Sequence, residues 1–305
     1  MNVDLVQAKV GEASSEAKAV AVHRRLGFFA YLACFRGIVS REVLRFLHQR
    51  ERFFSALVRP LVWLFIFAAG FRQTLGVSII PPYETYVLYE TFVAPGLVGM
   101  ILLFNAMQSS LSMVYDRETG AMRTLLVSPF PRSFLLVSKL IGGVAVAVLQ
   151  AYAFLAIAYL WEIEPPLIGY LTVLPALILA GLMLGSLALF MSSVIKQLEN
   201  FAGVMNFVIF PMFFASSALY PLWRVRESSP VLYEICRLNP FTYAVELIRF
   251  ALYGQLGPRL EDGSLDLTNI FVVLGYTVLF LGAAIYAYNP SKGLIARRGG
   301  PGGAA

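Results

Sequence analysis

The sequence predicts an all-α polytopic membrane protein. It would have six transmembrane helices, an N-terminal amphipathic interfacial helix, and a short re-entrant or outer helical pair before the last span. Of its 305 residues, 58% are apolar and only 14% are charged, whereas a soluble domain carries roughly 25% charged residues. Several charge-free runs exceed the length of about 20 apolar residues that crosses a bilayer. These runs are Thr91–Tyr115, Leu140–Trp161, Pro165–Ile195, Asn200–Trp223 and Leu267–Ser291. This composition excludes a disordered chain, a collagen, a coiled coil and an ordinary soluble enzyme.

The N-terminal region is predicted to divide in two. Residues 1–25 are polar and predict a flexible cytoplasmic tail. Residues 26–55 are amphipathic, with an apolar stripe of Phe and Val opposite a basic stripe that contains Arg41 and Arg45. Such a helix fits a membrane interface, its basic face toward anionic headgroups. The alternative is a core helix of a small soluble domain.

The six-helix transmembrane domain is predicted over residues 56–290. Its spans are placed at 56–71, 86–115, 139–160, 167–195, 201–221 and 269–288, and residues 291–305 form a mobile cytoplasmic tail. Arg59 falls in the first turn of the first span, where an arginine can reach the interface. The fourth span contains Gly181 and Gly185, a GxxxG pattern that permits close helix approach.

The distribution of basic residues predicts the orientation. Most of the 24 lysine and arginine residues lie in the two tails and in the loops on the same side of the predicted membrane. The positive-inside rule therefore predicts cytoplasmic N- and C-termini. The basic charge is explained by orientation and contact with membrane lipid, and we predict no nucleic-acid partner.

The usual chemical motifs are absent from the sequence. It has no GxxxxGK[ST] and no HExxH, and its second to sixth spans hold no ionisable residue near mid-membrane. We therefore predict no catalytic residue, no metal site and no cofactor bound by this chain. The energy for transport, or for any other process this chain carries out, would have to come from another molecule.

The first informative segment follows the second span and reads DRETGAMRTLLVSPFPR from Asp116. It predicts a short helix at the membrane edge, ended by two prolines, that a partner protein could grip. The alternative is a plain interhelical loop. Its candidate contact residues are Asp116, Arg117, Glu118, Gly120, Arg123, Leu125 and Leu126.

The second segment precedes the last span and reads NPFTYAVELIRFALYG from Asn239. Asn239 followed by Pro240 predicts an N-cap and the first residue of a helix. Glu246 and Arg249 lie three residues apart and can pair. The alternative is a small outer domain. The residues of interest in this segment are Asn239, Pro240, Phe241, Thr242, Tyr243, Glu246 and Arg249.

Together the two segments resemble the signatures of type-2 ABC exporter permeases. The order of elements over roughly residues 26–290 is similar too, and within the family the chain looks closest to drug, lipo-oligosaccharide and polysaccharide exporter permeases. The resemblance implies a permease subunit in the cell (inner) membrane, paired with a second permease as a homodimer or heterodimer. ATP and Mg would be bound by a separate ATP-binding-cassette ATPase.

The resemblance also implies roles for the two segments. Helix 26–52, with Arg41 and Arg45, and the first segment would contact the ATPase, and the second segment would form the outer gate. The cargo would be an amphiphilic, lipid- or glycan-like molecule or a drug, moved outward. The alternative function is a membrane-embedded enzyme or an assembly protein that acts through the outer segment 222–268, where Glu234, Glu246 and Arg249 offer polar groups.

Overall fold

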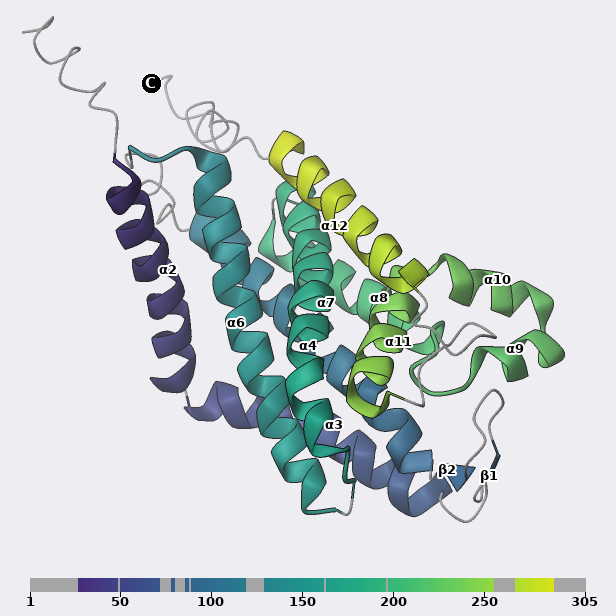
Figure 1. The fold of residues 1–305 in the computed structure, drawn as a ribbon. Coiled ribbons are helices and arrows are strands. Elements are labelled where there is room, and N and C mark those ends of the chain that lie inside the picture. Colours follow the sequence, from purple (N-terminus) through teal and green to yellow (C-terminus); the bar gives the residue numbers. More distant parts are fainter. Residues whose placement is uncertain are drawn as a thin grey trace, which may run out of the picture.

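The protein is a bundle of helices in the computed structural model, which describes residues 27–48, 50–71, 78–79, 86–87, 89–118, 129–161, 163–195, 197–254 and 267–287. The long helices are α2 (Phe28–His48), α3 (Arg50–Phe71), α4 (Tyr89–Glu118), α6 (Arg132–Tyr159), α7 (Leu167–Val194), α8 (Leu198–Phe214) and α12 (Leu267–Ala287) (Figure 1). Three shorter helices, α9 (Leu222–Ser228), α10 (Pro230–Leu238) and α11 (Pro240–Tyr253), lie between α8 and α12. One antiparallel pair of two-residue strands, β1 (Ser78–Ile79) and β2 (Tyr86–Val87), precedes α4.

The core is built around α4 and α7. Every residue from Phe92 to Leu103 on α4 is buried, because this helix packs against α3, α6, α7, α8 and α11. α7 contacts α4, α6, α11 and α12. Helices that are apolar on all sides belong either in a core or in a membrane, and α4 and α7 have the buried position.

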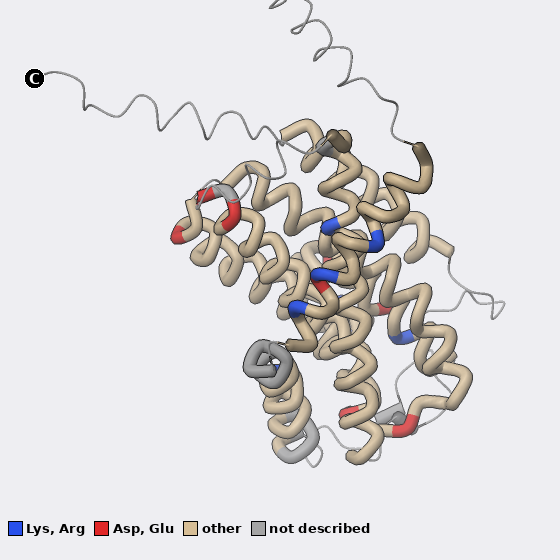
Figure 2. Tube along the Cα trace, turned by 90° about the vertical axis from the view of Figure 1, so that its left-hand side faces the viewer, with Lys and Arg blue, Asp and Glu red and all other residues tan. Residues whose placement is uncertain are grey.

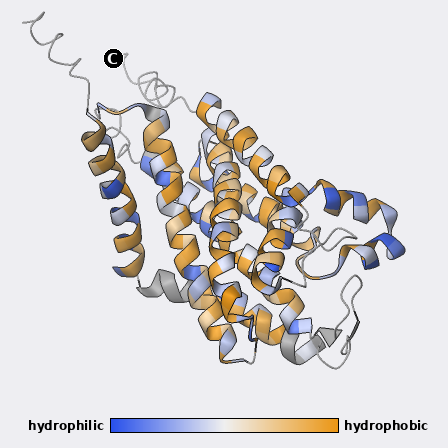
Figure 3. Cartoon of the chain, viewed as in Figure 1, coloured by the Kyte–Doolittle hydropathy of each residue, from blue (hydrophilic) through white to orange (hydrophobic). Residues whose placement is uncertain are grey.

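Four helices, α4, α6, α7 and α12, are long and apolar enough to cross a membrane. Two more carry shorter apolar segments, Leu57–Ile66 in α3 and Leu198–Phe214 in α8. α12 packs on α7 and α11 but leaves Phe271, Val278 and Tyr286 largely exposed. The apolar colouring of the bundle contrasts with the more hydrophilic α9 and α10 (Figure 3). The described residues therefore form a helical, multi-pass membrane protein with four candidate spans.

The structure divides the N-terminal region differently from the sequence prediction. The stretch 26–55 was expected to form one helix, but α2 ends at His48 and residues 50–55 belong to α3. The two helices separate because α2 packs along α6 whereas α3 packs mainly on α4. The predicted tails, 1–25 and 291–305, lie outside the described residues.

The apolar face of α2 rests on protein for part of its length. Tyr31 makes edge-to-face contacts with Phe130 and Phe134, with ring centroids 5.1 and 5.0 Å apart. Phe46, further along the same face, is buried, whereas Phe28 is exposed. The amphipathic pattern thus reflects packing on α6 over part of α2.

Glycines allow two close approaches in the bundle. A Cβ on Gly96 of α4 would lie 2.5 Å from the backbone oxygen of Ala218, which follows α8. The GxxxG residues of α7 face α6, where Gly181 lies against Val144 and Gly185 against Leu140. The small-residue pattern therefore brings α6 and α7 together, and Gly96 seats the chain after α8 on α4.

We expect Gly96→Ala to destabilise the protein by about 1–3 kcal/mol, because the new methyl group would overlap backbone that cannot rotate away. The measurement is thermal unfolding of the purified protein in detergent. Gly275→Ala on α12 is the matched control, since a Cβ there meets nothing within 4 Å. Equal stability of the two variants would contradict this packing.

Candidate functional site

The first predicted segment begins in the last turn of α4. Asp116 pairs with Lys139 of α6 across 3.3 Å, so the ends of these two helices are tied by charge. Glu42 of α2 packs against Gly142, one turn further along α6. Acidic and basic groups from α2, α4 and α6 thus gather at this end of the bundle.

Glu118 holds the beginning of α8. Its Oε1 atom accepts a hydrogen bond of 2.8 Å from the backbone N–H of Leu198, the first residue of α8. Gln197, at the N-cap position, provides no side-chain cap. A carboxylate at a helix N-terminus satisfies an orphan donor and the positive end of the helix dipole. Glu118 therefore acts as a cap supplied from another helix.

The remaining residues predicted for this segment are placed only in part. Arg117 lies in α4, but its side chain is outside the described part of the chain, as are Gly120, Arg123, Leu125 and Leu126. Arg41 and Arg45 are exposed on α2, and Arg41 pairs with its neighbour Glu42 at 3.2 Å. In the side view of Figure 2, α2 lies nearest the viewer and basic positions recur along it.

The second predicted segment starts α11 as expected. The Asn239 Oδ1 atom accepts a hydrogen bond of 3.0 Å from Phe241 N–H, with Pro240 at the first helical position, so the predicted cap is confirmed. The side-chain amide of Asn239 also donates hydrogen bonds. Its Nδ2 atom donates to the carbonyls of Met212 and Ala215, at 2.7 and 2.6 Å. These carbonyls lie at the C-terminal end of α8.

Arg249 is the most deeply buried charge in the described residues, with 1% of its surface exposed. It pairs with Glu246, as the spacing predicted. Its Nη2 atom donates to the carbonyl of Ser217 at 2.7 Å, and its guanidinium lies 4.0 Å above the ring of Phe92. Arg249 thus joins α11, the start of α4 and the chain that follows α8.

The other predicted gate residues are also held firmly. Phe241 is fully buried and contacts Phe213, with ring centroids 6.3 Å apart. The Thr242 hydroxyl donates to the Cys236 carbonyl at 2.7 Å, and the Tyr243 hydroxyl donates to the Arg237 carbonyl at 2.8 Å. Burial raises the pKa of Tyr243 above its ordinary value, so the hydroxyl remains a donor at neutral pH.

The two predicted segments meet through α8. Glu118 caps the first residue of this helix, and Asn239 binds the carbonyls at its other end. A helix of this length reaches about 25 Å. Neither site places a nucleophile beside a base. The arrangement links two distant positions by a rigid element, which suits mechanical transmission better than chemistry.

The described residues thus form a mainly helical, multi-pass membrane domain. The ABC-2 type transporter family matches residues 33–253, most of the chain. The protein therefore belongs to the ABC-2 type transporter family, whose members act with an ATP-binding-cassette ATPase.

Relatives with transport names support the same assignment. The "Putative transport permease ycf38" of Porphyra purpurea is 27% identical over 250 residues, 80% of this chain and 82% of the relative. The "Probable multidrug ABC transporter permease YbhR" of Escherichia coli (strain K12) is 30% identical over 211 residues, 67% of this chain and 54% of the relative. "Nodulation protein J" of Neorhizobium galegae is 23% identical over 237 residues, 73% of this chain and 81% of the relative.

Sequence reasoning missed the partners of the two motifs. These partners are backbone groups: the N–H of Leu198 and the carbonyls of Met212 and Ala215. The residue types at these positions therefore could not indicate the contacts. Phe92 and Ser217 were likewise not singled out, although both contact Arg249. One feature of the sequence did indicate the contact. Gln197, directly before α8, is a poor N-cap residue, so the cap had to come from another part of the chain.

We expect Glu246→Gln to destabilise the protein by about 3–5 kcal/mol, because it leaves the buried Arg249 cation without its carboxylate. The measurement is again thermal unfolding in detergent. Glu234→Gln is the control, since Glu234 pairs with Arg237 at the same spacing but across 3.9 Å and largely in solvent. Similar losses in both variants would contradict a special role for the buried pair.

Proposed function

We propose that this chain is the membrane-embedded permease subunit of an ATP-driven exporter. A separate ATP-binding-cassette subunit would bind ATP and Mg and hydrolyse the nucleotide. One observation carries this proposal: the two segments that resemble permease signatures bind the two ends of α8. A permease must connect a site that its ATPase can move with a gate on the other side of the membrane, and α8 offers that connection.

The proposed mechanism is a shift between two packed states. ATP binding would draw the ATPase subunits together and displace the segment between α4 and α6, which contains Gly120, Arg123, Leu125 and Leu126. Glu118 would pass the displacement to α8 through its cap, and Asn239 would pass it to α11. Because packed helices are bistable rather than continuously deformable, a small shift at one end can switch the other.

We propose six spans, with α3 and α8 as the additional two. Their apolar segments are short, but α8 stands between the two motifs and α3 leads directly into the part of the chain before α4. The described start of α2 and the end of α12 lie toward the same end of the bundle (Figure 1). Both termini are proposed to lie in the cytoplasm, beneath an inner membrane, because the basic residues are concentrated in the two tails and in the loops on the same side.

The second permease is proposed to be another copy of this chain. Exposed aromatic residues on α3 and α8, including Phe65, Phe207 and Phe210, offer a face to a second copy. The alternative activity, an enzyme or assembly protein acting through 222–268, is not taken further, because Glu246 and Arg249 are engaged with each other and with the surrounding helices.

The cargo is proposed to be amphiphilic, of the lipid-linked, glycan or drug class. The name of YbhR refers to multidrug transport, and the apolar spans of this chain suit a cargo taken from a membrane leaflet. Export is proposed because the resemblance in the two segments is to exporter permeases.

The experiment that tests the proposal is affinity purification of the tagged full chain from its native membranes, followed by ATP hydrolysis measurements on the purified complex. We expect an ATPase with a P-loop to co-purify and to hydrolyse ATP. Recovery of folded permease without such a subunit would contradict the proposal.

We further expect Glu118→Ala, which removes the acceptor of the Leu198 N–H, to leave the ATPase bound but to reduce cargo-stimulated hydrolysis about fivefold or more, a typical coupling energy between two sites. Glu199→Ala is the matched control, because Glu199 is an exposed acid in the first turn of α8. Stimulation assays in proteoliposomes give the measurement. A normal response in Glu118→Ala, or an equal loss in both variants, would show that the cap does not transmit the signal.

A further inference from the structure

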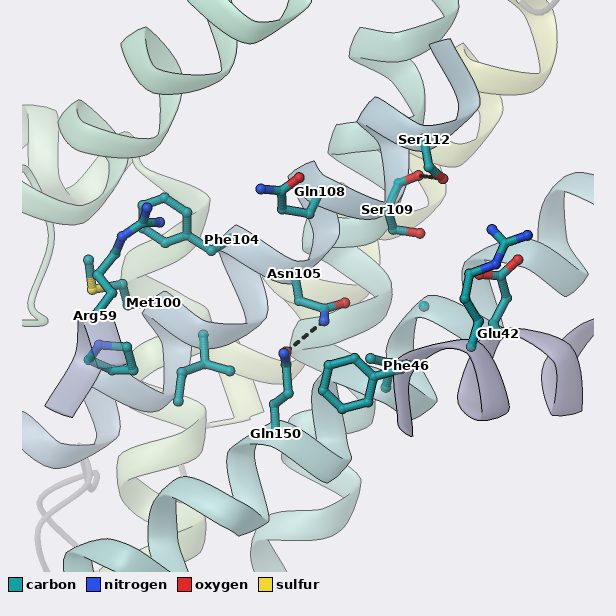
Figure 4. A pocket seen from close by; sticks show the side chains of 15 residues that line it. Glu42, Phe46, Arg59, Met100, Phe104, Asn105, Gln108, Ser109, Ser112 and Gln150 are labelled. Atoms are coloured by element: carbon teal, nitrogen blue, oxygen red, sulfur yellow. Dashed lines mark hydrogen bonds between the residues drawn. The ribbon is translucent and has the colours of Figure 1, made fainter. Parts of the chain in front are cut away.

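A polar cavity lies among α2, α3, α4 and α6 (Figure 4). Its volume is about 170 Å³, below the ~300–1,000 Å³ of pockets that enclose a drug-sized molecule. Its polar lining includes Glu42, Arg45, Arg59, Asn105, Gln108 and Gln150, and apolar side chains complete the wall. A cavity of this size holds a head group but not a whole amphiphile.

Arg59 marks one end of the cavity. Its guanidinium lies 3.9 Å from the ring centroid of Phe104, which is midway along α4. The sequence placed Arg59 in the first turn of a span, at the interface. In the structure its side chain is exposed on α3 and lies beside the middle of α4.

Among the described residues, Arg59 has an aromatic neighbour but no carboxylate within ion-pair distance. Arg59 falls within the apolar segment Leu57–Ile66, and an arginine in such a segment normally faces a partner or a transport path. Glu42, the acidic residue of the lining, pairs with Arg41, and Arg45 adds a further positive charge. The cavity therefore has an unneutralised cation.

Amide groups form the middle of the cavity. Asn105 of α4 donates to Gln150 of α6 at 2.6 Å, and Gln150 is 2% exposed. Gln108 lies one turn from Asn105, between the Arg59 end and the Glu42 end (Figure 4). Amide donors beside a guanidinium recognise anionic oxygens, while Met100 and Ile101 provide apolar wall for the first atoms of a tail.

We infer that this cavity binds the anionic head group, phosphate or carboxylate, of an amphiphile whose tail stays in the lipid. Arg59 would bind the charge, and Gln108 would supply a hydrogen bond. As an assignment of cargo class, the inference rests on the proposed function, but the binding site itself can be tested without the ATPase.

The test is calorimetric titration of the purified full chain, in neutral detergent, with three probes: dihexanoyl phosphatidic acid, dihexanoyl phosphatidylcholine and inorganic phosphate. We expect phosphatidic acid to bind more tightly than phosphatidylcholine. Weaker binding of inorganic phosphate identifies a lipid head group as the source, whereas equal binding of phosphate identifies a soluble anion in the same site. Failure to distinguish phosphatidic acid from phosphatidylcholine would overturn the inference.

Three substitutions test whether Arg59 is the residue that binds the charged head group. We expect Arg59→Gln to weaken phosphatidic acid binding about tenfold, the effect of losing one charged hydrogen bond. Arg224→Gln is the matched control, since Arg224 also lies over an aromatic ring, Trp223 at 5.0 Å, but outside the cavity. Gln108→Ala removes a solvent-accessible lining group with little risk to folding and should weaken binding to a smaller extent.

Unchanged affinity in Arg59→Gln, or the same loss in Arg224→Gln, would overturn the assignment. Because these titrations contain no ATPase, their failure leaves the proposed export function standing. Conversely, failure to recover an ATPase from native membranes would leave a binding site established by the titrations intact.

Discussion

The absence of water inside a bilayer requires each polar backbone group to find a partner within the protein. This requirement is most demanding where a helix begins or ends, because the terminal N–H and C=O groups have no partner in the helix itself. In α8 these groups are met from other elements, by the Glu118 carboxylate at one end and the Asn239 amide at the other. The residue types of both segments follow from this need: an acceptor for a helix start and a donor for a helix end.

The same constraint applies to the buried polar contacts of α11. The hydrogen bonds of Asn239 and Arg249 are wholly or partly shielded by the surrounding helices, so they hold the connected elements together. Arg249 extends the connection, since it binds Glu246, the Ser217 carbonyl and the Phe92 ring at once. The buried charge thereby ties α11 to α4 and to the chain that follows α8.

Local patterns in the sequence predicted local structure well. The Asn239 cap and the pairing of Glu246 with Arg249 depend on residues a few positions apart, and both are present. The capping of α8 by Glu118 joins positions 80 residues apart in the chain and could not be read from spacing. Nor could the packing of α2 on α6, because an apolar helix face looks the same whether it meets lipid or another helix.

Transmission through α8 is tested most directly by a distance between spin labels at the end of the bundle remote from Glu118. Labels at Leu167→Cys and Val231→Cys, in a chain with Cys34 and Cys236 replaced by alanine, occupy exposed positions on α7 and α10. The distance distribution would be recorded in the complex with its ATPase, with and without bound ATP. We predict that ATP shifts this distance in the otherwise unchanged chain and not in Glu118→Ala, which lacks the acceptor for the Leu198 N–H. An identical shift in both would contradict transmission through the α8 cap.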